Sequence, residues 1–159
     1  MGKNFSKSDR LDATELRVAM VVSRFNEELT SQLANDAFRC LEKNGAKVPN
    51  LGTFDVPGAY EIPVVANALA KSGKFDAIIA LGVVVEGETP HAQMIGHSTG
   101  IALLEIARET GVPVINEIVG TRNWEQAVVR CTSSETSRGW YAAEAAIEIA
   151  NGLKQIREA

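Results

Sequence analysis

Short apolar runs and stretches with helix-spaced apolar residues alternate along the chain. Apolar runs at residues 16–22, 48–56, 77–85 and 113–119 predict four β-strands. The run at 77–85 is almost entirely aliphatic, which is typical of a strand that is buried on both faces, as parallel sheets require. The four strands are therefore expected to form a parallel sheet.

Between these runs, apolar residues recur at steps of three and four, which predicts helices. The predicted helices contain residues 29–41, 62–69, 94–106 and 140–154. Asn123 is a suitable N-cap for a further short helix that runs to Val129. Strands that alternate with helices predict an α/β fold, a three-layer sandwich in which a four-stranded parallel sheet carries helices on both faces.

Length and composition fit one domain, which we place at residues 16–159. The chain has 159 residues, and its hydrophobic content of 45% is ordinary for a globular protein. Residues 1–15 are mostly polar and predict a flexible N-terminal arm. No signal peptide is visible, and no apolar run approaches the roughly 20 residues of a membrane span, so we expect a cytoplasmic protein.

Charge and cysteine content exclude several classes of function. The formal net charge of −4 argues against nucleic acid as a partner, because a phosphate backbone requires a basic surface. Cys40 and Cys131 are far apart and only two His residues are present, so we expect reduced packing cysteines and no metal site. Neither a G-x-G-x-x-G fingerprint after the first strand nor a P-loop is found. A small-molecule enzyme or an assembly protein fits best.

The candidate site residues follow the predicted strands. Ligands of parallel sheets bind outside the carboxyl ends of the strands, near the point where the strand order reverses. The candidates are therefore residues 23–26, 54–61, 84–91 and the neighbourhood of Asn116.

The segment Gly87-Glu88-Thr89-Pro90-His91 follows the most apolar strand and opens a predicted helix. Backbone N–H groups in a first helical turn lack partners, so the amides of Gly87, Glu88 and Thr89 can hold a phosphate or carboxylate. His91 then places a proton acceptor beside this anion site. In the structural alternative, Thr89 is an N-cap, Pro90 suits the first helical position and His91 is a solvated first-turn residue. The local sequence does not decide between the two.

Several pieces of sequence, in this order and spacing from about residue 16 to 154, resemble the lumazine synthase family. They are Ser23-Arg24-Phe25-Asn26, Pro57-Gly58-Ala59-Tyr60-Glu61-Ile62-Pro63, Ala80-Leu81-Gly82-Val83-Val84-Val85, Gly87-x-Thr89-x-His91, Glu125-Gln126-Ala127 with Arg130, and Arg138-Gly139. The resemblance implies a flavodoxin-like fold. It also implies a transferase of riboflavin biosynthesis that joins 5-amino-6-(ribitylamino)uracil to 3,4-dihydroxy-2-butanone 4-phosphate without a metal or organic cofactor.

The resemblance assigns residues to the pyrimidine substrate. Phe25 would stack on the ring, for which a flat aromatic surface is suited; the alternative is a core Phe behind the first strand. Asn26 and the backbone of Ala59 and Tyr60 would bind polar edges of the ring. Glu61 would receive the ribityl hydroxyls, a role compatible with a first-turn Glu that stabilises the helix dipole. The other implied substrate-binding residues are Val83, Val84, Val85 and Asn116.

The resemblance also assigns the phosphate and the proton transfers. Residues 87–89 match the phosphate-binding turn, and Arg130 matches an arginine that a neighbouring subunit supplies in the family. Read alone, Arg130 is a solvated surface charge. His91 would shuttle protons during imine formation and phosphate elimination. Arg138 is a further candidate contact.

Some positions near the implied site depart from the family pattern. They are Glu86, Ala92, Asn116, Ser134, Arg138 and Tyr141. Because they spare the Gly-x-Thr-x-His core, we expect changed affinity and pocket packing more than a lost reaction. They also leave open a non-catalytic relative that binds a flavin or lumazine or forms a shell. The family implies a homopentamer with shared sites, leaves a sixty-subunit shell open, and suggests riboflavin synthase as a partner.

Overall fold

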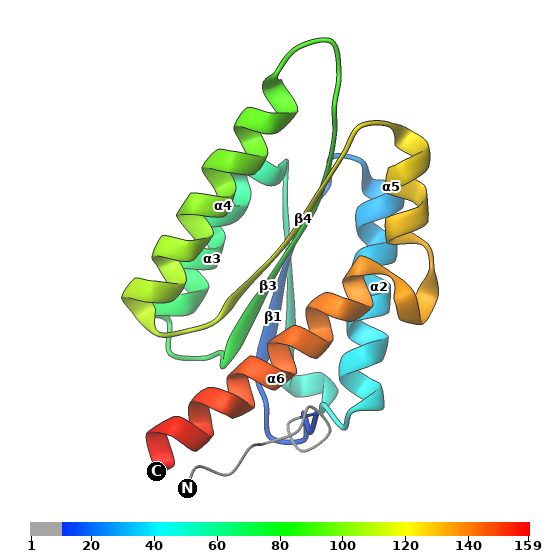
Figure 1. The fold of residues 1–159 in the computed structure, drawn as a ribbon. Helices are drawn as coiled ribbons and strands as arrows, with labels where there is room; N and C mark the ends of the chain where they lie inside the picture. Colours follow the sequence, from blue (N-terminus) through cyan, green and yellow to red (C-terminus); the bar gives the residue numbers. More distant parts are fainter. Residues whose placement is uncertain (1–10) are drawn as a thin grey trace, which may run out of the picture.

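A computed structural model describes residues 11–159, which fold around one four-stranded sheet (Figure 1). The strands are β1 (Val18–Ser23), β2 (Leu51–Val56), β3 (Ala77–Val85) and β4 (Val114–Thr121). All paired strands are parallel, and their order is β2-β1-β3-β4. After β1 the chain adds β2 on one side, and it then adds β3 and β4 on the other side. The strand order therefore reverses between β1 and β3, and open α/β sheets bind ligands at such a point.

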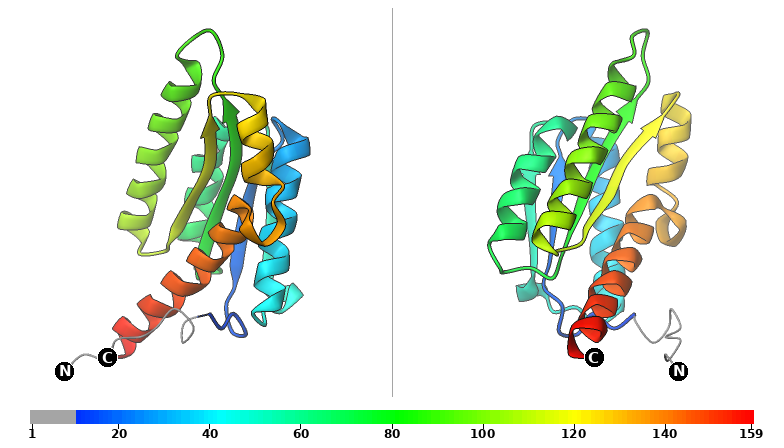
Figure 2. Two further views of the ribbon diagram at one scale, coloured as in Figure 1. Left: turned by 45° about the vertical axis from the view of Figure 1, so that its right-hand side comes forward. Right: turned by 60° about the vertical axis from the view of Figure 1, so that its left-hand side comes forward.

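Helices cover both faces of the sheet. The α-helices of the described residues are α2 (Glu27–Lys43), α3 (Ile62–Lys71), α4 (His91–Thr110), α5 (Trp124–Cys131) and α6 (Arg138–Glu158). Short 3-10 helices are η1 (Val48–Asn50), η2 (Ala59–Glu61) and η3 (Ser134–Thr136). Figures 1 and 2 show α3 and α4 on one face and α2, α5 and α6 on the other. The predicted three-layer, flavodoxin-like sandwich is therefore confirmed.

Two apolar layers, one on each face of the sheet, form the core. Side chains of β3 alternate between them: Ile79 packs in the layer that contains Leu33 and Ile147, while Ile78 packs in the layer that contains Ile62. The first seven residues of β3 are all buried. Burying an aliphatic side chain of this size stabilises the fold by about 1.5–3 kcal/mol. The prediction of a strand buried on both faces is confirmed.

Three strands differ from their predicted bounds. β1 spans Val18–Ser23, whereas a strand over residues 16–22 was predicted. β2 begins at Leu51, because residues 48–50 form a 3-10 turn that contains a proline. β4 extends to Thr121 and includes Asn116 and Glu117. Glu117 is buried and hydrogen-bonded to an arginine of α6, so the polar interruption in the apolar pattern lies inside the strand.

The predicted N-terminal arm is described only in part. Residues 1–10 lie outside the described residues. Residues 11–15, expected to belong to the flexible arm, pack against the domain. Ala13 is fully buried and its N–H donates to the carbonyl of Asn44 at 2.8 Å. The side chain of Asn151 donates to the carbonyl of Asp12 at 2.7 Å.

Two expectations from composition can be compared with the structure. Cys40 and Cys131 are buried and neither forms a disulfide, as predicted for packing cysteines. Within residues 11–159, none of the helices has the length and hydrophobicity to cross a membrane.

Candidate active site

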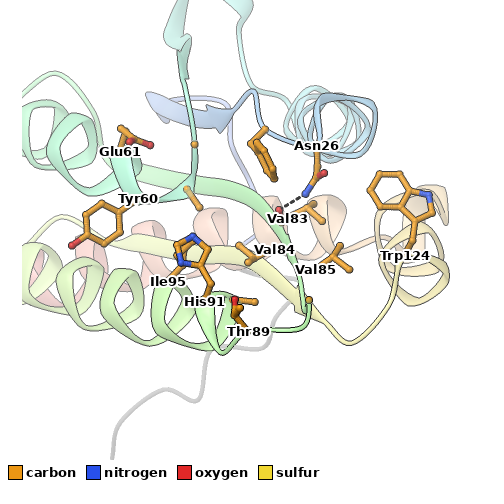
Figure 3. A pocket seen from close by; sticks show the side chains of 15 residues that line it. Asn26, Tyr60, Glu61, Val83, Val84, Val85, Thr89, His91, Ile95 and Trp124 are labelled. Atoms are coloured by element: carbon orange, nitrogen blue, oxygen red, sulfur yellow. Dashed lines mark hydrogen bonds between the residues drawn. The ribbon is translucent and has the colours of Figure 1, made fainter.

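A cavity of about 480 Å³ opens at the carboxyl ends of β1 and β3 (Figure 3). The end of β3 forms its floor, and the connections that follow all four strands contribute to its walls. The lining residues are Phe25, Asn26, Gly58, Ala59, Tyr60, Glu61, Val83, Val84, Val85, Gly87, Thr89, His91, Ala92, Ile95 and Trp124. Most residues predicted from strand ends therefore meet at one place.

The first wall is the turn between β1 and α2. The backbone N–H groups of Arg24 and Phe25 donate to carbonyls at the end of β2, at 2.8 and 3.2 Å. Asn26 has a left-handed backbone (φ 59°), and its Nδ2 donates to the carbonyl of Val83 at 2.8 Å. These bonds fix the turn above the floor of the cavity. Phe25 is 69% exposed, so its interpretation as a core residue is wrong.

The second wall is the segment between β2 and α3. A β-carbon added to Gly58 would lie 3.0 Å from Oε2 of Glu61, so the chain is tightly folded here. Ala59 is buried, whereas Tyr60 and Glu61 are exposed and stand at the same end of the cavity in Figure 3. Glu61 is also the N-cap residue of α3, where a carboxylate faces the positive end of the helix dipole. Both predicted roles of Glu61 are thus structurally compatible.

The third wall is the connection from β3 to α4. Because α4 begins at His91 with Pro90 as its N-cap residue, the alternative interpretation of Thr89 as an N-cap is wrong. Residues 87–89 form a loop before the helix, and the N–H groups without intrahelical partners start at His91. Gly87, Thr89 and His91 line the cavity, whereas Glu88 does not.

The fourth wall contains a residue that the sequence analysis did not single out. Trp124 opens α5 and lines the cavity with 37% of its surface exposed. In Figure 3 it stands at the opposite end of the cavity from Tyr60 and Glu61. The available signal was an aromatic residue directly after the predicted cap Asn123. This aromatic residue points to the site only once β4 is known to end at Thr121, because Trp124 then lies just after the carboxyl end of a strand.

Four predicted site residues do not line this cavity: Glu88, Asn116, Arg130 and Arg138. Asn116 lies within β4, and its Oδ1 accepts a hydrogen bond from the N–H of Ile118 at 3.1 Å. Arg130 lines a second hollow, and Arg138 is bonded to Glu117. The cavity of one chain therefore lacks the arginine that the family resemblance assigns to the phosphate.

The second hollow has a volume of about 450 Å³ and lies next to the first cavity, with which it shares Val84 and Ala92. Its charged residues are Glu86, Arg122 and Arg130. Two guanidinium groups and one carboxylate give this hollow net positive charge. Guanidinium groups bind phosphate oxygens through paired hydrogen bonds, so the hollow can attract an anion.

Arg138 is held by its own chain. Its Nε donates to Oε1 of Glu117 at 2.5 Å and its Nη2 donates to Oε2 at 3.1 Å. These bonds raise the pKa of the guanidinium. Glu117 thus occupies two hydrogen-bond donors of Arg138, the residue that the family resemblance suggested as a further substrate contact.

The thiol of Cys131 is protonated at neutral pH, because burial and, secondly, the charge of Glu117 raise its pKa to about 11.

Comparison with known protein families matches residues 15–154 to 6,7-dimethyl-8-ribityllumazine synthase. The chain belongs to this family. The match spans nearly the whole domain and includes every residue that lines the cavity. Membership in the lumazine synthase family gives the chain a role in riboflavin biosynthesis and places it among transferases.

Proposed function

We propose that the chain condenses 5-amino-6-(ribitylamino)uracil with 3,4-dihydroxy-2-butanone 4-phosphate to 6,7-dimethyl-8-ribityllumazine, with release of phosphate and water. This is the penultimate step of riboflavin biosynthesis. The observation that carries the proposal is the cavity itself. In a member of this family, it brings together an exposed aromatic ring, a carboxylate, a glycine-containing loop and an imidazole. These groups belong to Phe25, Glu61, the loop residues Gly87 and Thr89, and His91.

The pyrimidine would lie against Phe25, whose exposed ring offers a flat surface for stacking. The backbone of Ala59 and Tyr60 provides polar groups along one wall. The valines at the end of β3 form an apolar floor, which favours an uncharged heterocycle. Glu61, at the end of the cavity beside Tyr60, would accept hydrogen bonds from the ribityl hydroxyls.

The phosphate-bearing substrate would lie beside Thr89 and the start of α4. Nothing lies within 4 Å of a β-carbon added to Gly87, so a ligand can approach this backbone closely. The free N–H groups at the start of the helix and the Thr89 hydroxyl are suitable donors for an anion. Figure 3 shows His91 and Thr89 on the same wall of the cavity. The imidazole is therefore close to the proposed phosphate site.

His91 would act as the proton shuttle of the reaction. The amine of the pyrimidine attacks the ketone carbonyl, and His91 takes a proton from the attacking nitrogen. The same proton can be returned to the hydroxyl that leaves as water when the imine forms. Elimination of phosphate and closure of the second ring complete the product. Holding the two substrates together supplies a large part of the acceleration.

A homo-oligomer would complete this site. Arg130 lines the second hollow and not the first cavity of its own chain, so we expect the Arg130 of a neighbouring copy to bind the phosphate, as the family resemblance implies. Helix α4 carries three exposed apolar side chains, Met94, Ile101 and Leu104, of which Leu104 is 73% exposed. Such side chains are typical of surfaces that are covered in an assembly. These observations support a homo-oligomer, for which the family resemblance suggests a pentamer.

One observation favours the second candidate function, a non-catalytic lumazine- or flavin-binding relative. Glu86 lines the same hollow as Arg130, and a carboxylate beside the phosphate arginine weakens phosphate binding. His91 and Thr89 favour the enzyme, since a binding protein needs no proton shuttle beside an anion site.

Turnover tests the proposal directly. The purified protein is mixed with both substrates, and formation of lumazine and release of phosphate are followed together against the slow uncatalysed reaction. We expect coupled release of both products at an accelerated rate. An assembled protein that binds lumazine but does not accelerate the reaction would support the non-catalytic relative.

A further inference from the structure

We propose that Trp124 is a second aromatic contact for the heterocyclic ring of the pyrimidine substrate and the lumazine product, an inference that rests on the proposed function. Phe25, in the turn before α2, and Trp124, at the start of α5, line one cavity. Both helices lie on the same face of the sheet (Figure 1), and Figure 3 shows Trp124 at one end of the cavity. A flat heterocycle bound above the end of β3 therefore meets aromatic surface from both helix starts.

Trp124 belongs to the inward-facing stripe of α5 but lies beyond the packed core. The buried residues of this helix are Ala127 and Cys131, three and seven positions after Trp124 and thus on the same side of the helix. Both are fully buried, whereas Trp124 is 37% exposed. Its indole continues the stripe at the point where the sheet ends, because β4 stops at Thr121. The side chain is therefore placed over the cavity instead of the core.

Hydrogen bonds hold the turn that carries Trp124. Oγ1 of Thr121 donates to the carbonyl of Asn123 at 3.0 Å, and the N–H of Gln126 donates to Oδ1 of Asn123 at 2.9 Å. The N–H of Arg122 donates to Oε1 of Gln126 at 3.0 Å. This closed set of bonds fixes the backbone on both sides of Trp124. A cavity wall whose backbone is fixed before binding loses little entropy when a flat ligand binds to it.

The chemistry of the indole suits a heterocyclic ligand better than the phosphate-bearing one. An indole offers a large π-surface and a single N–H donor, and replacing an aromatic side chain that stacks on a base by alanine weakens binding of that base. The four-carbon ketone phosphate has no flat ring for such a contact. Trp124 should therefore affect one substrate and not the other.

The test compares Trp124→Ala and Trp124→Phe with the wild type. We expect Trp124→Ala to raise both the KM for the pyrimidine and the Kd for lumazine, measured by calorimetry, by about 5- to 100-fold. The KM for the ketone phosphate should change less than about two-fold, since its contacts lie elsewhere. Trp124→Phe keeps a flat ring and should recover most of the affinity. Val129→Ala is the control, because Val129 is exposed on the same helix and lines neither cavity.

The outcomes separate this inference from the proposed function. If the wild type turns over and both Trp124 variants keep its KM and its Kd for lumazine, the role of Trp124 is overturned and the enzyme stands. If the wild type binds lumazine without turnover, the Kd values alone decide the role of Trp124. A folded wild type that neither turns over nor binds lumazine would overturn both proposals.

Discussion

At the scale of single residues, the cavity selects one of two histidines on the same helix. His91 opens α4 and lines the cavity, whereas His97 lies further along the helix, is exposed and lines neither of the two hollows. Of the described residues, His91 is therefore the imidazole that can reach a substrate bound beside Thr89 and Phe25.

Replacing His91 by alanine should slow the chemistry and leave the fold intact. We expect kcat to fall by about ten- to a thousand-fold, because general acid–base help is typically worth about 10² to 10⁴ while proximity of the substrates is retained. Steady-state turnover measures the effect, and an unchanged circular dichroism spectrum shows that the fold persists. His97→Ala, the same change on the same helix, should keep the wild-type rate. An unchanged kcat in His91→Ala would disprove the proton-shuttle role.

At the scale of elements, the start of α5 has two roles: its N-cap stabilises the helix, and its first residue forms part of the candidate site. Asn123 was predicted as an N-cap from sequence, and its Oδ1 accepts a hydrogen bond from the N–H of Gln126. The helix that it caps begins at Trp124. A cap that stabilises a short helix also fixes a wall of the cavity.

Asn123→Ala should lower the free energy of unfolding by about 0.5–2 kcal/mol, because an N–H of the first turn loses its acceptor. Chemical denaturation of the assembled protein at a fixed protein concentration measures the change. Asn35→Ala makes the same substitution at an exposed position within α2 and should leave stability unchanged or slightly raised, since alanine is the better helix former. Equal losses in both variants would show that the cap contributes nothing specific.

At the scale of the whole molecule, the candidate site is divided between two hollows. His91 lies in the first cavity, and Arg130 lies in the second. If the arginine serves the cavity of a neighbouring copy, each complete site takes its imidazole and its guanidinium from different chains. The two halves can then be inactivated in separate chains.

Co-expression of His91→Ala and Arg130→Ala chains should therefore give a specific activity above that of either variant alone. With random assembly at equal amounts, about a quarter of the sites would combine an intact His91 with an intact Arg130. Specific activity of the mixed oligomer, purified through two different tags, measures this fraction. Variants assembled separately and then mixed serve as the control. Co-assembled chains without restored activity would contradict a site shared between subunits.

The sequence predicted most of the fold because its signals are local. Aliphatic runs mark buried strands, three- and four-residue spacings mark helix faces, and Asn123 marks a helix start. The parallel order of strands then brings their carboxyl ends to one edge, so residues as distant as Phe25 and His91 were expected at one site. The cavity contains both of them.

By itself, the sequence determined the four strands, the layered fold, the family and most of the residues that face the cavity. Tertiary structure decided where each strand and helix starts and ends, since backbone pairing and packing set those limits. It made Pro90, and not Thr89, the N-cap residue of α4, joined Arg138 to Glu117 by hydrogen bonds and left Trp124 exposed over the cavity. Each of these features depends on contacts between residues that are far apart in the sequence. A local sequence pattern does not specify which distant residues come into contact.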